Sequence, residues 1–121
     1  MAILFDPTSR LLGEMIQHTA LRHRVLASNL ANVETPAYQA QEATFSVALE
    51  EAQGNAGSAA RPALRTAVAT DPDAAVREDG NSVDMDRQMV KLTQNSIWHS
   101  AMIQMLNSRF SLLKTAIKDR G

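Results

Sequence analysis

In the C-terminal third of this 121-residue chain, mostly apolar residues recur at intervals that alternate strictly between four and three positions. Ten positions from Met85 to Ile117 follow this alternation, and only Ser96 and His99 among them are polar. The apolar members are Met85, Met89, Leu92, Ile103, Leu106, Phe110, Leu113 and Ile117. Such spacing places side chains on one side of an α-helix and is typical of helices that pack against another helix. We therefore predict that segment 84–121 is a long helix, with Asp84 as its N-terminal cap.

The N-terminal segment 1–36 carries a shorter version of the same pattern. Asp6 followed by Pro7 is a favourable helix start, because Asp can cap a helix and proline is tolerated in the first turn. The apolar members are Leu12, Ile16, Leu26, Leu30 and Val33, and Thr19 and His23 occupy the two intervening positions. Thr35-Pro36 ends the pattern, since proline cannot donate the next helical hydrogen bond and disfavours helical geometry in the preceding residue. A second helix is therefore expected over about 8–33.

The two helices would be about 40 and 50 Å long at 1.5 Å per residue, so they can pair along most of the shorter one. In an antiparallel pair, matching Val33 with Met85 also matches Leu12 with Leu106. The same register places Thr19 opposite His99, with His23 beside Ser96. The polar interruptions of both helices would then meet in one layer, which fixes register at some cost in stability. We predict an all-α fold in which two terminal helices form an antiparallel, coiled-coil-like pair through this helix-pair seam.

The middle segment 37–83 shows no sustained period and is rich in alanine, glycine and proline. Residues 64–69 and 74–77 are candidates for two short strands around the turn sequence Asp71-Pro72-Asp73. The alternative is a flexible connector. We expect an irregular segment in either case.

A second apolar strip lies beside the seam of the C-terminal helix. It consists of Trp98, Met102, Met105 and Leu112. A pair of helices cannot cover both strips, and exposed apolar strips are typical of proteins that assemble with partners. The sequence therefore favours an assembling protein.

Composition and charge argue against several other classes. The formal net charge is −1, from 12 basic and 13 acidic residues, which provides no strong field for binding nucleic acid. Cysteine is absent, so disulfides and thiol chemistry are excluded. No apolar run reaches the roughly 18 residues that a membrane span requires. The N-terminus has an apolar cluster, Ile3, Leu4 and Phe5, but no features of a cleaved signal peptide.

Candidate catalytic and metal-binding residues have simpler interpretations. His18 and His23 are five residues apart, which separates them by about 140° around a helix and prevents joint chelation of a metal. His99 and Ser96 lack an orienting carboxylate nearby in the sequence. Asp84 and Asp86 are best interpreted as groups at a helix N-terminus. The glycine-rich loops that hold phosphates are missing. We expect no enzyme activity, no cofactor and no metal.

Two motifs resemble a known family. The first consists of Ser28, Asn29, Leu30, Ala31, Asn32, Thr35, Pro36 and Tyr38. It is similar to the signature S-N-[aliphatic]-A-N-x-x-T-P-G-Y of the flagellar rod and hook axial proteins. Ala37 stands where this family usually has glycine, so a left-handed backbone there would be strained. The second motif, D-G-N-S-V-D-M-D at 79–86, resembles the start of the last helix in proximal rod proteins of the family.

The resemblance implies a structural subunit of the bacterial flagellar basal body that polymerises through its terminal helices in the proximal rod. It implies a role in the drive shaft and in the wall of the export channel. Export would proceed through the flagellar type III apparatus without a cleaved signal peptide, and assembly would follow in the periplasm. The implied partners are further copies of the chain, the rod proteins FlgC, FlgF and FlgG, and the junction protein FliE.

Two alternatives stay open on the sequence alone. Ile3, Leu4 and Phe5 are a candidate export signal or an apolar tail without a role. The protein itself has a second interpretation, as a helical adaptor or export chaperone that binds partner helices in the cytoplasm.

Overall fold

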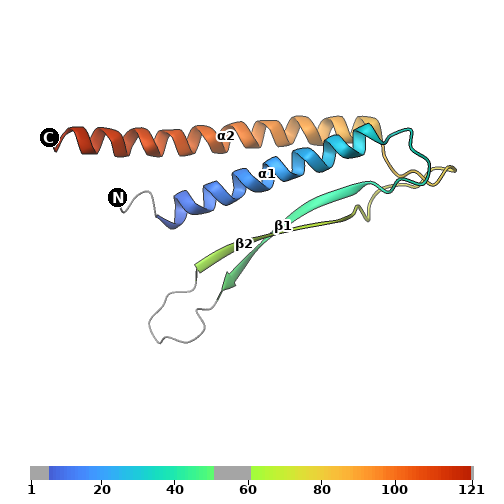
Figure 1. Cartoon of the computed structure of the whole chain (residues 1–121), viewed down its shortest axis with the longest axis horizontal. Helices are drawn as coiled ribbons and strands as arrows, with labels where there is room; N and C mark the ends of the chain where they lie inside the picture. The colour runs from blue at the N-terminus through green and yellow to red at the C-terminus, as the bar shows by residue number, and fades with distance from the viewer. Residues whose placement is uncertain (1–5, 51–60, 121) are drawn as a thin grey trace.

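The computed structural model describes residues 6–50 and 61–120, which form two long helices and a β-hairpin. Helix α1 spans Pro7–Ala31, strand β1 spans Gln41–Glu50, strand β2 spans Arg61–Thr70 and helix α2 spans Met85–Lys118. The helices run antiparallel, and α1 lies between α2 and the hairpin (Figure 1). The start of α1 and the end of α2 lie at one end of the molecule, and the segments joining the hairpin to the helices lie at the other (Figure 1). We refer to the latter as the loop end.

The helix boundaries follow local chemistry. Pro7 occupies the first turn of α1, but the Asp6 side chain does not cap the helix and instead forms an ion pair with Arg109 on α2. At the other terminus, α1 stops at Ala31, before the helix-breaking Thr35-Pro36. The start of α2 is capped as predicted, because Asp84 Oδ1 accepts a hydrogen bond from the Arg87 N–H at 3.2 Å. None of the described helices is both long and apolar enough to span a bilayer.

A mainly helical architecture with a hairpin in the middle segment is confirmed, but the hairpin lies elsewhere than predicted. Residues 64–69 do form a strand, yet their partner is β1 and not 74–77. The antiparallel register pairs Gln41 with Thr70 at the loop end and Glu50 with Arg61 at the other. Asp71-Pro72-Asp73 forms a local turn in which Asp71 Oδ1 accepts from the Asp73 N–H at 3.0 Å. That turn leads away from the sheet and does not reverse the chain into a second strand.

The core is small and unusually polar. Its buried apolar side chains are Leu12, Val25, Leu26, Ala40, Ala43, Val83 and Met102. The largest side chains that are almost wholly buried are Leu26 and four amides, Gln88, Asn29, Asn81 and Asn95. Among the described residues, every buried side-chain nitrogen or oxygen has a hydrogen-bond partner. Satisfied polar groups of this kind fix one arrangement of the elements more strictly than apolar contacts alone would.

The side of α2 that faces α1 coincides with the predicted seam at every second position and is shifted by one residue at the others. Its least exposed positions repeat in steps of four and three: Gln88, Leu92, Asn95, His99, Met102, Leu106, Arg109 and Leu113. Leu92, His99, Leu106 and Leu113 were predicted for the seam. The other predicted apolar members, Met85, Met89, Ile103, Phe110 and Ile117, are between 37% and 63% exposed. Met102, assigned by sequence to the second strip, is buried.

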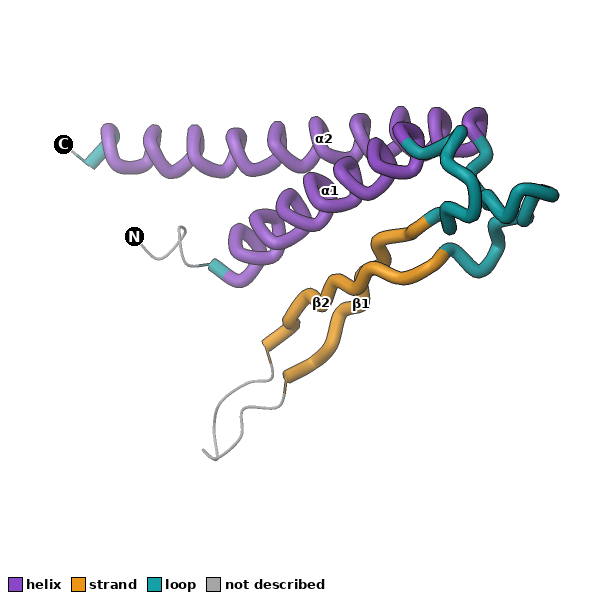
Figure 2. Tube along the Cα trace, turned by 45° about the vertical axis from the view of Figure 1, so that its right-hand side comes forward, coloured by secondary structure: helices purple, strands orange, loops and turns teal. Residues whose placement is uncertain are grey.

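Hydrogen bonds between the helices explain this shift. Gln88 Oε1 accepts from Asn29 Nδ2 at 3.0 Å, and Asn95 Nδ2 donates to the Thr19 carbonyl oxygen at 2.8 Å. Arg109 Nε donates to Ser9 Oγ at 3.1 Å. Of these partners, Asn29 and Ser9 lie on α1 at positions outside the predicted apolar spacing, and Thr19 contributes its backbone carbonyl. On α1 itself Leu12 and Leu26 are buried, whereas Ile16 and Leu30 are only half-buried. Val33, also half-buried, lies beyond the end of the helix. The helices lie closest at the loop end and diverge toward the chain termini (Figures 1 and 2).

Candidate functional site

The two sequence motifs meet at the loop end, with Asn81 at the centre of their contact. Asn81 Nδ2 lies 2.9, 3.1 and 2.7 Å from the carbonyl oxygens of Asn32, Val33 and Thr35, which follow the end of α1. Its Oδ1 accepts from the Val83 N–H at 2.7 Å. The last carbonyls of a helix have no partner within the helix, so a side chain from elsewhere must satisfy them. Asn81 does this for the first motif from within the second.

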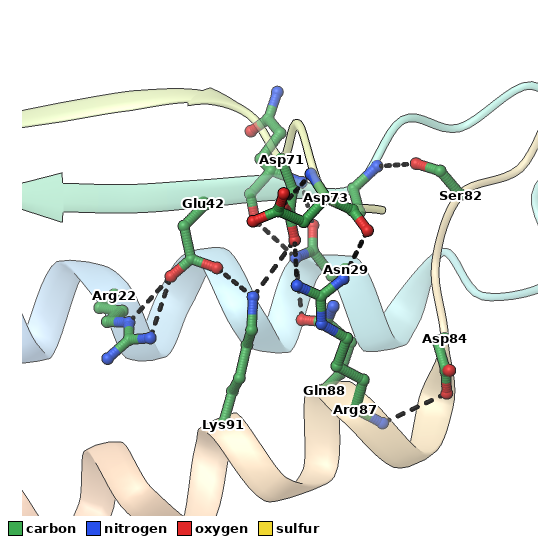
Figure 3. Close-up of polar contacts among 12 residues, drawn as sticks. Arg22, Asn29, Glu42, Asp71, Asp73, Ser82, Asp84, Arg87, Gln88 and Lys91 are labelled. Carbon is green, nitrogen blue, oxygen red and sulfur yellow. Dashed lines mark hydrogen bonds and ion pairs between the residues drawn. The ribbon is translucent and has the colours of Figure 1, made fainter. Parts of the chain in front are cut away.

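Asn29 binds the backbone of the hairpin through its side-chain amide, as Asn81 binds the backbone after α1. Its Nδ2 donates to the Gln41 carbonyl oxygen at 2.8 Å and its Oδ1 accepts from the Gln41 N–H at 3.0 Å, which joins α1 to the first residue of β1. Figure 3 shows Asn29 pointing from α1 toward Gln88 of α2. One fully buried amide therefore links three elements, and no smaller or apolar side chain could replace all of its bonds.

The remaining motif residues stabilise the turn between α1 and β1. Asn32 Nδ2 donates back to the Ser28 carbonyl oxygen at 2.8 Å, and Thr35 Oγ1 donates to Asn32 Oδ1 at 3.1 Å. Tyr38 Oη lies 3.3 Å from Ser28 Oγ. From the second motif, Ser82 Oγ accepts from the Ala40 N–H at 2.8 Å (Figure 3). Within this chain both motifs therefore act as one clasp, which we call the loop-end clasp, that fixes the angle at which helices and hairpin meet.

Ala37 occupies the tightest position of this clasp. Its φ of +62° is the one positive value outside glycine among residues 6–50 and 61–120. Ala37 N–H donates to the Asp79 carbonyl oxygen at 3.0 Å, so the clasp requires this conformation. Gly80 faces it, and a Cβ added to Gly80 would lie 3.2 Å from Ala37 Cα. The left-handed backbone anticipated at Ala37 is therefore present.

A half-buried charge cluster lies beside the clasp (Figure 3). Lys91 of α2 forms ion pairs with Glu42 of β1 and, at 3.2 Å, with Asp71 after β2. Arg22 of α1 reaches Glu42 at 3.0 Å, and Arg87 lies 3.6 Å from Asp71. Burial of the Asp71 carboxyl alone would raise its pKa, but the Asp73 N–H, Lys91 and Arg87 outweigh burial, and the pKa is lowered. The cluster joins α1, β1, α2 and the residue that follows β2 through ion pairs.

Half of the polar layer predicted between the helices is present. Thr19 Oγ1 and His99 Nδ1 are 2.7 Å apart. The only hydroxyl proton of Thr19 is directed at the Ile16 carbonyl oxygen, 2.9 Å away, so His99 Nδ1 carries the proton of the shared bond. His99 is thus held as a packing residue. The other two predicted members of the layer, His23 and Ser96, are exposed and line a groove beside the helices.

His18 also has a structural role. It is buried against the hairpin, with Nδ1 3.2 Å from Thr66 Oγ1 and its ring edge-on to Phe45 at 4.7 Å. Burial, and the neighbouring positive charge of Arg22, lower the pKa of His18 against a smaller opposing effect of Glu42. In the part of the chain that the structure describes, no three His, Asp or Glu side chains converge as metal ligands would.

Comparison with known proteins identifies the family. Flagellar basal body rod protein FlgB of Aeromonas hydrophila is 31% identical over 129 residues that cover 98% of each chain. FlgB of Cereibacter sphaeroides (strain ATCC 17029 / ATH 2.4.9) is 35% identical over 107 residues, 80% of this chain and 83% of the relative. The chain belongs to the FlgB family of flagellar basal body rod proteins. FlgB of Bacillus subtilis (strain 168), 27% identical, matches 94% of the chain, whereas no family model matches.

As a member of the FlgB family, the protein is a structural subunit of the flagellar basal-body rod. Most of the large apolar side chains exposed in the described part of the chain lie on α2. We define the Phe110 strip as Met89, Ile103, Phe110 and Ile117, and the Trp98 strip as Trp98, Met105 and Leu112. Members of the Phe110 strip are between 37% and 63% exposed, and those of the Trp98 strip between 56% and 71%. Ile3, Leu4 and Phe5, the candidate export signal, lie outside the described residues.

Sequence reasoning found the family motifs and the polar layer of this FlgB-family chain but missed the residues that orient α2. Gln88, Asn95 and Arg109 are spaced by multiples of seven, and Met102 completes the repeat. A search for periodic polar residues, rather than for apolar ones, would have revealed this line. The charge cluster of Glu42, Asp71 and Lys91 has no such signal, because its members are scattered along the sequence.

Proposed function

We propose that this FlgB-family subunit polymerises through α1 and α2 in the proximal rod and forms part of the drive shaft and of the export-channel wall. In this proposal it has no catalytic role. It is exported by the flagellar type III apparatus without a cleaved signal peptide and assembles in the periplasm. Its neighbours are further copies of the chain, the rod proteins FlgC, FlgF and FlgG, and the junction protein FliE. Ile3, Leu4 and Phe5 are proposed to contribute to export.

The accessible surface is the main support for polymerisation. The chain exposes 8563 Å² at a mass of 13.2 kDa. A compact monomer of that mass would expose about 6,400 Å². The excess is on the order of 2,000 Å², comparable with the area buried in a typical protein interface. Because much of the exposed side-chain surface of α2 is apolar, contact with neighbouring subunits would stabilise it.

The charge distribution of α2 supports a place inside a wall. Between positions 92 and 113 the only Asp, Glu, Lys or Arg is Arg109, whose guanidinium is already bound to Asp6. A helix surrounded by water normally carries charges over its outer face. The face opposite α1 instead presents exposed uncharged polar residues such as Gln104, Ser108 and Ser111. An uncharged polar surface would neither attract nor hold a passing unfolded chain, as a channel lining requires.

The test places a negative charge on the Phe110 strip. Ile103→Asp and Phe110→Asp would each bury a carboxylate between apolar neighbours in an assembled rod, which costs several kcal/mol. In the isolated subunit both side chains are exposed, so the folded monomer should tolerate them. Cells that carry either variant as the sole copy should be non-motile in soft agar, and purified basal bodies should contain membrane rings without a rod.

Gln104→Asp is the matched control. It adds the same charge to the same helix, one residue away from Ile103 but on the face opposite α1. Rods and motility should persist with this variant, and circular dichroism should show equal helicity in all three. Normal rods with charged residues at 103 and 110 would refute polymerisation through α2. A purified chain that stays monomeric at all concentrations would then favour the helical adaptor instead.

A further inference from the structure

The β-hairpin is bound to α1 firmly near the loop end and sparsely farther out. Near the loop end, Asn29 makes two hydrogen bonds with the first residue of β1, and Arg22 pairs with Glu42. Among the strand side chains that the structure describes, at 41–46 and 64–70, only that of Ala43 is buried. Docking of the outer half of the hairpin therefore depends on few contacts with α1.

His18 makes the central contact of this outer half. Phe45 and Thr66 are direct partners in the register of the two strands, so their side chains share one face of the sheet. His18 lies against this pair, with Nδ1 3.2 Å from Thr66 Oγ1 and its ring 4.7 Å from that of Phe45. His18 is only 5% exposed, whereas Phe45 is 50% exposed. A neighbouring bond at 3.3 Å joins the Leu64 N–H to Glu14.

Helix α1 and strand β1 supply the charged groups nearest to His18. Arg22 lies one helical turn after it and Glu14 one turn before it. The Glu14 carboxylate is bound to an arginine of the preceding turn and to the hairpin backbone. Glu42 of β1 is paired with Arg22 and Lys91. Both carboxylates therefore already have cationic partners.

Strand β2 and helix α2 add no charge to the contact. Arg65 is adjacent to Thr66 in the strand, so its side chain points to the opposite face of the sheet. The one histidine of α2, His99, contacts Thr19. The α2 residues that line the groove beside His18 are uncharged: Asn95, Trp98 and Met102. Among the described residues, neither element places a carboxylate where it would stabilise a positive charge on His18.

We propose that His18 acts as a pH-sensitive switch for the hairpin, which docks on α1 while the imidazole is neutral and is released when the imidazole gains a proton. The bond to Thr66 can form in either state, because a hydroxyl both donates and accepts. The cost of protonation lies in burying a charge beside Arg22. Burial and Arg22 lower the pKa of His18, against a smaller opposing effect of Glu42. The inference goes beyond the proposed function and does not depend on how subunits polymerise.

The direction of the pH dependence follows from this difference. In the released state His18 meets water and has its ordinary pKa of about 6.5, whereas the pKa in the docked state is lower. Docking is therefore strongest above about pH 6.5 and weakens as the pH falls toward the docked pKa. Each pH unit between the two pKa values shifts the equilibrium toward release by up to about tenfold. A two-stranded hairpin without packing is marginal, so its amides should then exchange with solvent.

Hydrogen exchange of the full chain at micromolar concentration tests the switch. Protection is compared at about pH 7.5 and about pH 5.5, after correction for the pH dependence of intrinsic exchange. Amides of 43–46 and 64–66 should lose protection several-fold at the lower pH, whereas amides near Ala40 in the loop-end clasp should not. His18→Asn keeps a neutral polar side chain at both pH values and should abolish the difference. His23→Asn, which replaces an exposed histidine of the same helix, is the matched control and should behave as the wild type does.

Several results would overturn the proposal. Hairpin protection that is equal at both pH values in the wild type would do so, and so would a loss in His18→Asn as large as in the wild type. A loss that extends equally to the clasp amides would mean unfolding of the whole chain and not release of the hairpin. If His18→Asn lacks hairpin protection at both pH values, the ring signal of His18 in the wild-type chain decides by NMR titration. A pKa below about 6.5 would support the switch, and a pKa at or above it would refute it.

Discussion

Ala37 holds a left-handed backbone conformation that non-glycine residues adopt at a cost of about 1–2 kcal/mol. Its N–H bond to the Asp79 carbonyl oxygen requires that conformation, so the strain persists in the folded chain. Ala37→Gly should remove most of the strain while increasing the entropy of the unfolded chain. We expect a net gain of about 0.5–1 kcal/mol in the free energy of unfolding. Urea denaturation followed by circular dichroism measures it.

Ala75→Gly is the control for this prediction. Ala75 is also an exposed alanine of the middle segment, but its φ is not positive. Glycine there should leave stability unchanged or lower it slightly, because only the entropy of the unfolded chain changes. If both variants shift the urea midpoint in the same direction, Ala37 is not a site of strain.

At the scale of elements, the charge cluster predicts an acid-sensitive junction. The pKa of Asp71 is lowered from 3.8 in the folded chain, so its ion pairs with Lys91 and Arg87 contribute stability above the unfolded pKa. That contribution is lost as the pH falls through the folded pKa. Acidification from about pH 5 to about pH 3 should therefore destabilise the chain, and Asp71→Asn should flatten this dependence. Thermal unfolding across this range measures the slope.

Asp86→Asn provides the comparison for Asp71→Asn, because Asp86 is exposed in the first turn of α2 and has no ion pair in the cluster. Removal of the Asp86 carboxyl should leave most of the pH dependence of stability in place. A wild-type slope that Asp71→Asn does not change would show that the Asp71 carboxyl does not control acid unfolding.

The helices show how much of the fold the spacing of apolar residues could predict. The 4-3 alternation predicted the antiparallel pair and its register, because Thr19 does lie against His99. It misplaced every second seam position of α2 by one residue, since it counts apolar side chains and ignores buried amides. Gln88 and Asn95 face α1 because their hydrogen bonds would otherwise be lost on burial. Methionines such as Met89 are then left exposed.

The hairpin and the motifs depend on contacts between residues far apart in the sequence, which the sequence pattern could not predict. Residues 64–69 were recognisable as a strand, but their partner β1 lies twenty positions upstream, and pairing over such a distance leaves no local signal. The motif Asn29 to Tyr38 was recognisable only by resemblance. Its physical role emerged from contacts with Asn81, more than forty positions away, which no spacing rule connects.

At the scale of the whole molecule, packing is unevenly distributed along the helix pair. The loop-end clasp, the charge cluster and the Thr19–His99 contact involve positions 81 to 99, which are the first half of α2 and the residues just before it, and they hold that half in place. Beyond Arg109, Leu113 is the only residue of α2 that is even half-buried. Helices without tertiary contacts are marginal in water, so the two halves of α2 should differ in stability.

Hydrogen exchange of the full chain tests this gradient. At micromolar concentration, amides in the half of α2 nearer the clasp should be protected, whereas those after Arg109 should exchange early because few contacts oppose local opening. In purified basal bodies the late half should become protected as neighbours cover the Phe110 and Trp98 strips. Amides near Ala40, buried in the clasp, serve as the internal control and should change little. Equal protection of both halves in the free chain, unchanged on assembly, would mean that the helices are already stable alone, and polymerisation through them would lose its physical basis.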